Sequence, residues 1–220
     1  MTVYADNAAT TQMSDSVLKA MMPLLTDIYG NPSSLHSVGQ IAKEHLEAAR
    51  ETVAECIGAD PKEIYFTSGG SEADNQAIRS AAYIGARKGK KHIISSKFEH
   101  HAVLHTLDAL KKEGFTVTLL DVYSNGIVKP EDVANAITEE TCLVTIMTAN
   151  NEIGTIQPIT EIGKICKEKG VLFHTDAVQA VGHIPVNVKD MNIDMLSASG
   201  HKFHGPKGTG FLYISNSVKI

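Results

Sequence analysis

The stretch Met195-Leu196-Ser197-Ala198-Ser199-Gly200-His201-Lys202 starts as a short apolar run, changes to small and polar residues, and delivers one lysine. A glycine-rich segment, residues 205–210, follows it. We therefore expect a buried strand that ends in a tight turn carrying Lys202. A desolvated lysine loses its proton more easily, because burial disfavours the charged form. Lys202 is then a candidate nucleophile for a Schiff base, although this stretch alone fits an ordinary solvated loop equally well.

A second apolar strand, residues 171–175, is followed by the carboxylate of Asp176. Open α/β sheets bind their ligands beyond the carboxyl ends of the strands, so this carboxylate is expected at such a place. A lysine for an aldehyde and a carboxylate for a pyridinium nitrogen are the minimum set for pyridoxal 5′-phosphate. Asp176 should stay ionised beside a protonated ring nitrogen, which makes the cofactor an electron sink.

Six motifs follow one another in the order typical of one enzyme family. They are Gly30-Asn31-Pro32-Ser33-Ser34-Leu35-His36, Thr67-Ser68-Gly69-Gly70-Ser71-Glu72, Glu99-His100, Asn150-Asn151-Glu152-Ile153-Gly154, Asp176-Ala177-Val178-Gln179 and Ser199-Gly200-His201-Lys202. With them the chain resembles the cysteine desulfurases (NifS/IscS-like) of the class V aminotransferase superfamily, from Tyr4 to the last strand. The resemblance implies a pyridoxal-phosphate enzyme of fold type I that converts L-cysteine to L-alanine and transfers the sulfur to an enzyme cysteine as a persulfide.

Bulk composition excludes several other classes of protein. The chain has 220 residues, 20 basic and 25 acidic, with a net charge of −5 and no basic patch that would indicate nucleic-acid binding. No apolar run approaches the ~20 residues of a membrane span, and no secretory signal is visible at the N-terminus. The three cysteines show no metal-binding spacing, and so sparse a set fits a reducing compartment, with the cytoplasm as the default.

The order of apolar runs and glycine turns predicts one α/β domain. Residues 1–13 read as an N-terminal arm, and residues 14–220 as a pyridoxal-phosphate-binding large domain with a mainly parallel seven-stranded sheet and helices on both faces. The last strand follows Lys202 after only a turn, so we expect it to be antiparallel. The expected strands are 64–67, 92–96, 116–122, 143–148, 171–175, 194–198 and 209–214; the expected helices between them are 72–87, 101–113, 131–137 and 162–169.

Two further helices are expected before the first strand. Ser14 should cap the first of them, and Pro23 should kink or divide it. In the second, apolar residues recur at helical spacing and place Cys56 on the buried stripe.

The glycine turn before the third helix is a candidate phosphate site. Glycines let a ligand approach the backbone, and the N–H groups at a helix start attract phosphate, so Gly70 and Ser71 are candidates. By itself this motif is better explained as a plain N-cap. The resemblance instead assigns phosphate binding to Ser71, with Ser199 and His201 on the opposite side.

His100 follows the second strand and could stack on the cofactor ring and handle protons near neutral pH. His101 and His105 are four residues apart and could form half of a metal site, but no third ligand has suitable spacing, so we predict no metal. A solvated helix start explains these two histidines better. The resemblance assigns the stacking role, and with it a catalytic role beside Lys202, to His100.

Asn151 and Gln179 are the remaining candidates for cofactor binding. A side-chain amide at Asn151 could bond the phenolic oxygen of the cofactor, but Asn and Gly are also ordinary turn residues. Gln179 lies three residues after Asp176, and the resemblance gives both amides the phenolic-oxygen role. His174 and Thr175 are assigned no function.

The family's catalytic cysteine, its substrate-binding arginine and its small C-terminal domain lie beyond residue 220, so the resemblance implies an incomplete large domain that is inactive alone. Cys56, Cys142 and Cys166 are each expected to be small core residues. L-cysteine, a second copy of the chain and sulfur-acceptor or scaffold proteins are the partners that the resemblance implies. A selenocysteine lyase, another class V aminotransferase, or a non-catalytic cofactor-binding or dimerisation module remain alternatives. The residues do not decide whether the chain is a truncation.

Overall fold

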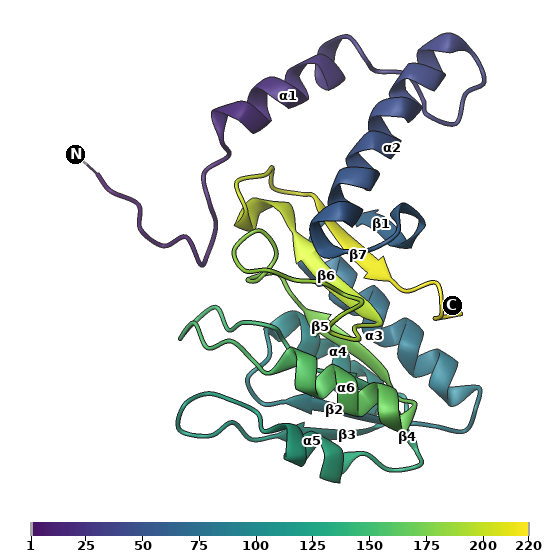
Figure 1. The fold of residues 1–220 in the computed structure, drawn as a ribbon, viewed down its shortest axis with the longest axis vertical. Helices are drawn as coiled ribbons and strands as arrows, with labels where there is room; N and C mark the ends of the chain where they lie inside the picture. The colour runs from purple at the N-terminus through teal and green to yellow at the C-terminus, as the bar shows by residue number, and fades with distance from the viewer. Residues whose placement is uncertain (1, 220) are drawn as a thin grey trace.

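The computed structural model describes residues 2–219 and contains one seven-stranded sheet with helices packed on it (Figure 1). The strands are β1 (Ile64–Thr67), β2 (His92–Ser96), β3 (Thr116–Leu120), β4 (Thr141–Thr145), β5 (Leu172–Asp176), β6 (Met195–Ser199) and β7 (Gly210–Ile214). The α-helices are α1 (Asp15–Thr26), α2 (Ser37–Ile57), α3 (Gly70–Ala86), α4 (His101–Lys112), α5 (Pro130–Ala136) and α6 (Ile159–Lys169); the 3₁₀ turns are η1 (Pro61–Glu63) and η2 (Gly200–Lys202).

The strands lie in the order β1-β7-β6-β5-β4-β2-β3. All pairs between β3 and β6 are parallel, whereas β7 pairs antiparallel with both β1 and β6. The predictions of a mainly parallel sheet and of an antiparallel last strand are therefore confirmed. Because β5 and β6 are parallel neighbours, their carboxyl ends, with Asp176 and Ser199, meet at the same edge of the sheet.

Helices cover both faces of the sheet, and successive residues of one strand pack on opposite faces. Ile93 packs in the hydrophobic cluster beneath α3 and α4, whereas Ile94 packs in the cluster beneath α5 and α6. In β6, Met195 packs in the cluster beneath α3 and α4, and Leu196 packs in the cluster beneath α5 and α6. This doubly covered arrangement buries the strands β2, β4, β5, β6 and β7 at nearly every position, as in parallel sheets generally.

Strand and helix boundaries differ from the expected ones by a few residues. The third strand ends at Leu120 instead of 122, and the fourth covers Thr141–Thr145 instead of 143–148. Helix α6 starts at Ile159, three residues early, because Ile159 is buried in the core and extends the apolar face of the helix.

The first two helices test the predictions made for Ser14, Pro23 and Cys56. Ser14 does cap α1, since its Oγ accepts from the Val17 N–H at 3.3 Å, but Pro23 does not divide the helix, which continues to Thr26. Cys56 is exposed, so its placement on a buried stripe was wrong. Helix α2 extends away from the sheet (Figure 1), and near its C-terminal end Ala54 and Ile57, three residues apart, form the buried side. Cys56 lies between them on another side of the helix and faces solvent.

Between residues 2 and 219, no helix combines the length and the apolar character that crossing a membrane requires.

Candidate active site

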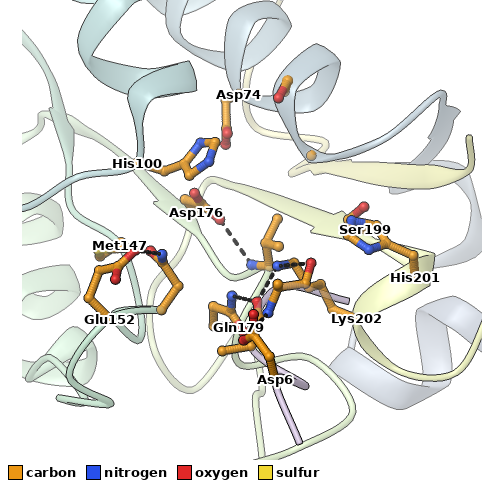
Figure 2. Close-up of a pocket in the computed structure, with 16 residues that line it drawn as sticks. Asp6, Asp74, His100, Met147, Glu152, Asp176, Gln179, Ser199, His201 and Lys202 are labelled. Carbon is orange, nitrogen blue, oxygen red and sulfur yellow. Dashed lines mark hydrogen bonds between the residues drawn. The ribbon is translucent and has the colours of Figure 1, made fainter. Parts of the chain in front are cut away.

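A cavity of about 440 Å³ lies at the carboxyl ends of β5 and β6, beside the first turn of α3 (Figure 2). It contains every cofactor-site residue that the sequence suggested. These residues come from five separate segments of the chain: Gly70, Ser71, His100, Asn151, Asp176, Gln179, Ser199, His201 and Lys202. The structure thus brings the candidates together in one place, while their individual roles stay predictions.

Lys202 reaches the cavity from η2, directly after β6. Its Nζ donates to the backbone carbonyl oxygens of Ala8 and, at 3.0 Å, of Ala9. Burial lowers the pKa of this amine, and the carboxylates of Asp176 and Asp6 offset part of the shift. The side chain is half-buried, so the uncharged, nucleophilic amine is populated at a lower pH than in a surface lysine.

Asp176 is the last residue of β5 and is only 4% exposed. Its Oδ1 accepts from the Val178 N–H at 2.9 Å, which fixes the carboxyl at the floor of the cavity. Burial raises the pKa of Asp176, while the Val178 N–H, His100 and Lys202 act in the opposite direction. A cation beside this carboxyl would therefore favour its ionised form.

The first turn of α3 forms the wall of the cavity next to Ser199 and His201. The N-cap is Gly69, whose φ of 154° only glycine readily adopts, so Ser71 lies inside the helix and is not its cap. A Cβ on Gly70 would come within 2.5 Å of a Val178 methyl group, which leaves room only for glycine. A second cavity of about 450 Å³ continues along this turn and is also lined by Lys207, a cation that the sequence analysis did not select.

His100 is the N-cap of α4, and its Nδ1 accepts from the Ala102 N–H at 3.1 Å, which orients the ring. The residue before it, Glu99, is buried and accepts from the Ser96 hydroxyl at 2.6 Å and from the Met147 N–H at 2.9 Å. Burial raises the pKa of Glu99 to about 8. Glu99 thus ties the segment that carries His100 to the chain that follows β4, a role that the sequence did not reveal.

His101 and His105 stack on the exposed side of α4, with ring centroids 5.3 Å apart, as expected for a solvated helix start. Within residues 2–219, no group of three or more His, Cys, Asp or Glu side chains is arranged to hold a metal ion.

The amides of Asn151 and Gln179 both line the cavity but have protein partners. Asn151 Nδ2 donates to Glu152 Oε1 at 2.6 Å, and Gln179 Nε2 donates to the Ala8 carbonyl oxygen at 2.8 Å. Each amide keeps its own oxygen free of any protein donor among the described residues. A ligand that binds these amides must share or replace the existing contacts.

The N-terminal arm contributes directly to the site, which the sequence reading did not anticipate. The Thr10 hydroxyl lies 3.0 Å from His201 Nδ1. Thr11 donates from its N–H and hydroxyl to the His201 carbonyl, at 2.9 and 2.8 Å. The Ala8 and Ala9 carbonyl oxygens accept from Lys202 Nζ, so the arm contacts both the lysine and the residue before it.

Beneath the cavity lies a buried polar row that the sequence reading left without a function. The His174 ring is fully buried, with Nδ1 2.8 Å from the Thr145 hydroxyl and Nε2 2.9 Å from the Ser197 hydroxyl. Burial lowers the pKa of His174 to about 3, so the ring is neutral. Asp74 of α3 lies beside it, lines the cavity and is 1% exposed.

None of the three cysteines lines the cavity. Cys142 and Cys166 are buried, as predicted, and burial raises the pKa of their thiols to about 11 and about 12. Neither thiol forms a thiolate readily near neutral pH, and the exposed Cys56 lies on α2.

Comparison with known proteins agrees with this arrangement. The chain matches the aminotransferase class-V family over residues 3–219 and belongs to it. Within that family it is similar to cysteine desulfurases: it is 58% identical over 218 residues to cysteine desulfurase IscS of Clostridium botulinum strain Hall, and 55% identical to cysteine desulfurase IscS of Methanosarcina thermophila. The match covers 99% of this chain and 55% of the clostridial protein, so the chain spans about half the length of these relatives.

Solved structures of two similar proteins have the same fold. A NifS-like protein superposes on the whole chain with a TM-score of 0.96 and 44% identity, over 60% of its own length. SspA in complex with cysteine superposes with a TM-score of 0.95 and 44% identity, over 98% of this chain and 62% of its own. Members of this family depend on pyridoxal phosphate in general, and the cavity fits it: an amine, a buried carboxyl and an N-terminal helix turn without room for a side chain face the same space.

Proposed function

We propose that the cavity binds pyridoxal 5′-phosphate and that the protein is a cysteine desulfurase, which converts L-cysteine to L-alanine. The observation that carries the proposal is the convergence of Lys202 and Asp176 on one cavity whose wall is the glycine turn of α3. The high similarity to proteins named cysteine desulfurases supports the choice of reaction.

In this proposal some residues of the chain bind the cofactor and others transfer protons. Ser71, Ser199 and His201, with the N–H groups of the first turn of α3, hold the phosphate. Asn151 and Gln179 bind the phenolic oxygen, and the His100 ring covers the face of the cofactor. When bound, the cofactor withdraws electrons from the α-carbon of its amino-acid substrate.

Lys202 attaches the cofactor and acts as the base at the substrate α-carbon. Its lowered pKa favours the neutral amine that both tasks require. Asp176 holds the proton of the ring nitrogen, because an anionic carboxylate accepts this bond more strongly than a neutral group does.

Sulfur removal needs an acceptor thiol. L-cysteine and a cysteine thiol give L-alanine and a persulfide, which balances atoms and electrons without an added oxidant. The thiols of Cys56, Cys142 and Cys166 are not placed for this step, since none of them lines the cavity. We propose that the acceptor thiol belongs to the complete enzyme, which passes the sulfur to acceptor or scaffold proteins for iron–sulfur cluster and related biosynthesis.

We further propose that the protein acts as a homodimer. Large apolar side chains on and between α1 and α2 are exposed, among them Leu25, Tyr29 and Leu35 at 65%, 79% and 94%. Exposed apolar groups of this extent are typical of interaction surfaces. Light scattering on the purified chain should give the mass of a dimer or a larger species; a stable monomer would contradict this part of the proposal.

Titration of the purified 220-residue chain with pyridoxal 5′-phosphate tests the binding claim. We expect saturable visible absorbance with the chain itself and with the control Lys91→Ala, whose lysine is exposed and outside the cavity. Lys202→Ala should lose the protein-bound absorbance band, and pyridoxal without phosphate should bind far more weakly. A chain that gives the same absorbance after Lys202→Ala would contradict the assignment.

A further inference from the structure

The carboxyl group of Asp74 is a buried acid that the proposed function does not yet use. Asp74 lies one turn into α3, after Gly70 and Ser71, and points into the cavity toward His100 and Asp176 (Figure 2). Within residues 2–219, neither of its carboxyl oxygens has a hydrogen-bond partner of normal geometry. A buried polar group without a partner costs about 1–3 kcal/mol, so a position of this kind calls for a compensating role.

The surroundings of Asp74 contain acids and no permanent cation. Its Oδ1 lies 3.7 Å from His174 Nε2, but the buried His174 ring is neutral and supplies no charge. Burial, followed by the nearby Asp176 and then Glu99, raises the pKa of Asp74, and only the Ser197 hydroxyl opposes the shift. The nearest amine in the cavity is that of Lys202, which donates to the carbonyl oxygens of the arm.

Asp74 and Asp176 therefore make one end of the cavity acidic. Two carboxyls in a desolvated site do not ionise together unless a cation lies near them. A cationic ligand group that enters this end lets both carboxyls ionise, and it gains the attraction of both. A neutral group at the same position gains neither.

We propose that Asp74 is a second acidic group of the cofactor pocket, which acts together with Asp176 to select and position a ligand whose aromatic ring is protonated. The inference rests on the proposed function, in which that ligand is pyridoxal 5′-phosphate, and adds to it a residue outside the six family motifs. Asp74 is a positioning residue in this account: it strengthens the hold of Asp176 on the ring nitrogen.

The test compares two ligands on two proteins. Dissociation constants are measured by fluorescence for pyridoxal 5′-phosphate and for its analogue in which CH replaces the ring nitrogen. Asp74→Asn keeps the shape of the side chain and removes its charge. It should weaken binding of pyridoxal 5′-phosphate about tenfold, the effect typical of one lost charged contact, and leave binding of the nitrogen-free analogue almost unchanged.

A structural role for Asp74 predicts a different result. Equal weakening of both ligands, or no change for either, would overturn the inference. If the unaltered chain binds neither ligand, the proposed function fails first, and the inference fails with it. Should Asp74→Asn not fold, Asp74→Ala is measured in the same way.

The stability of the cofactor-free protein gives a second readout. Removing an unpartnered acid should stabilise the fold at pH 8, and less so at pH 5, since the proton that Asp74 retains on folding costs more as pH rises. Asp190→Asn, an exposed loop carboxyl outside the cavity, is the matched control and should show no such gain. A less stable Asp74→Asn protein at pH 8 would contradict the inference, because it would mean that the carboxyl stabilises the fold.

Discussion

Single buried residues govern how the stability of this protein depends on pH. Glu99 has its pKa raised from 4.5 to about 8, so between these values it keeps a proton in the folded chain that the unfolded chain loses. The pKa of His174 is lowered from 6.5 to about 3, so between these pH values the unfolded chain binds a proton at His174 that the folded chain does not. Stability therefore falls with rising pH because of Glu99 and rises with pH because of His174, and the two oppose each other below pH 6.5.

Above pH 6.5 only the buried acids act, so we expect the free energy of unfolding to fall between pH 6.5 and 8. Each such group contributes at most about 1.4 kcal/mol per pH unit. Glu99→Gln should reduce the fall and leave the part due to Asp74, whose pKa burial raises well above its usual value. Denaturant unfolding at the two pH values measures this, with the exposed Glu139→Gln as control. An equal fall for Glu99→Gln and the unaltered chain would show that Glu99 is ionised in the folded protein.

The substitution Asp176→Asn tests the proposed role of this carboxylate at the ring nitrogen of the cofactor. The amide fits the space and can still accept from the Val178 N–H, so we expect the cofactor to bind. A neutral amide does not hold the ring proton, and α-proton exchange of alanine in deuterium oxide should slow roughly a hundredfold. Unchanged exchange, followed by NMR, would remove Asp176 from this role.

Among the elements, the N-terminal arm contacts His201, Lys202 and His204. Its contacts with the segment around Lys202 are made largely by backbone groups and by two threonine hydroxyls. Thr11 is central to them: it is 6% exposed, donates to the His201 carbonyl and accepts from the His204 N–H at 2.8 Å. The arm thereby fixes the turn that carries the lysine.

Thr11→Val removes the hydroxyl and keeps the shape. We expect a loss of about 1–2 kcal/mol in the free energy of unfolding and weaker binding of pyridoxal 5′-phosphate, because the His204 N–H is left without its acceptor. Thr26→Val, on the exposed end of α1, is the matched control and should alter neither quantity appreciably. If both variants behave alike, the arm does not support the site.

The sheet and most helices were predictable because apolar runs alternate with glycine turns, and a strand covered on both faces is rich in apolar residues. Cys56 was misplaced for a physical reason. An apolar stripe shows that a helix can pack, but it does not fix which side the rest of the fold covers, and the covered side of α2 is set by Ala54 and Ile57 and not by Cys56.

Some residues of the candidate site were likewise predictable from the sequence, and others were not. Residues in motifs, such as Lys202 and Asp176, were found because their side-chain chemistry is specific. Asp74 was missed because an acid near a helix start normally faces solvent and favours the helix dipole. The arm was missed because the Ala8 and Ala9 carbonyls act through the backbone, about 190 positions away in sequence, and no residue type marks such contacts.

At the scale of the whole molecule, the chain has a well-formed candidate cofactor cavity that no cysteine lines. We therefore expect the 220-residue chain, loaded with pyridoxal 5′-phosphate, to exchange the α-proton of L-cysteine but to release sulfide near background. A sulfide assay with L-cysteine and a reducing thiol measures this. Robust turnover that is abolished by mutating Cys56, Cys142 or Cys166 would refute the conclusion that none of these thiols takes part.

The central claim is that Lys202 holds the cofactor in the cavity between β5, β6 and α3. Borohydride reduction of the chain with pyridoxal 5′-phosphate, followed by peptide mapping, tests it most directly. We expect a single pyridoxyl group, on Lys202. A label on Lys207, which lines the neighbouring cavity along the first turn of α3, or on the exposed Lys91 would contradict it.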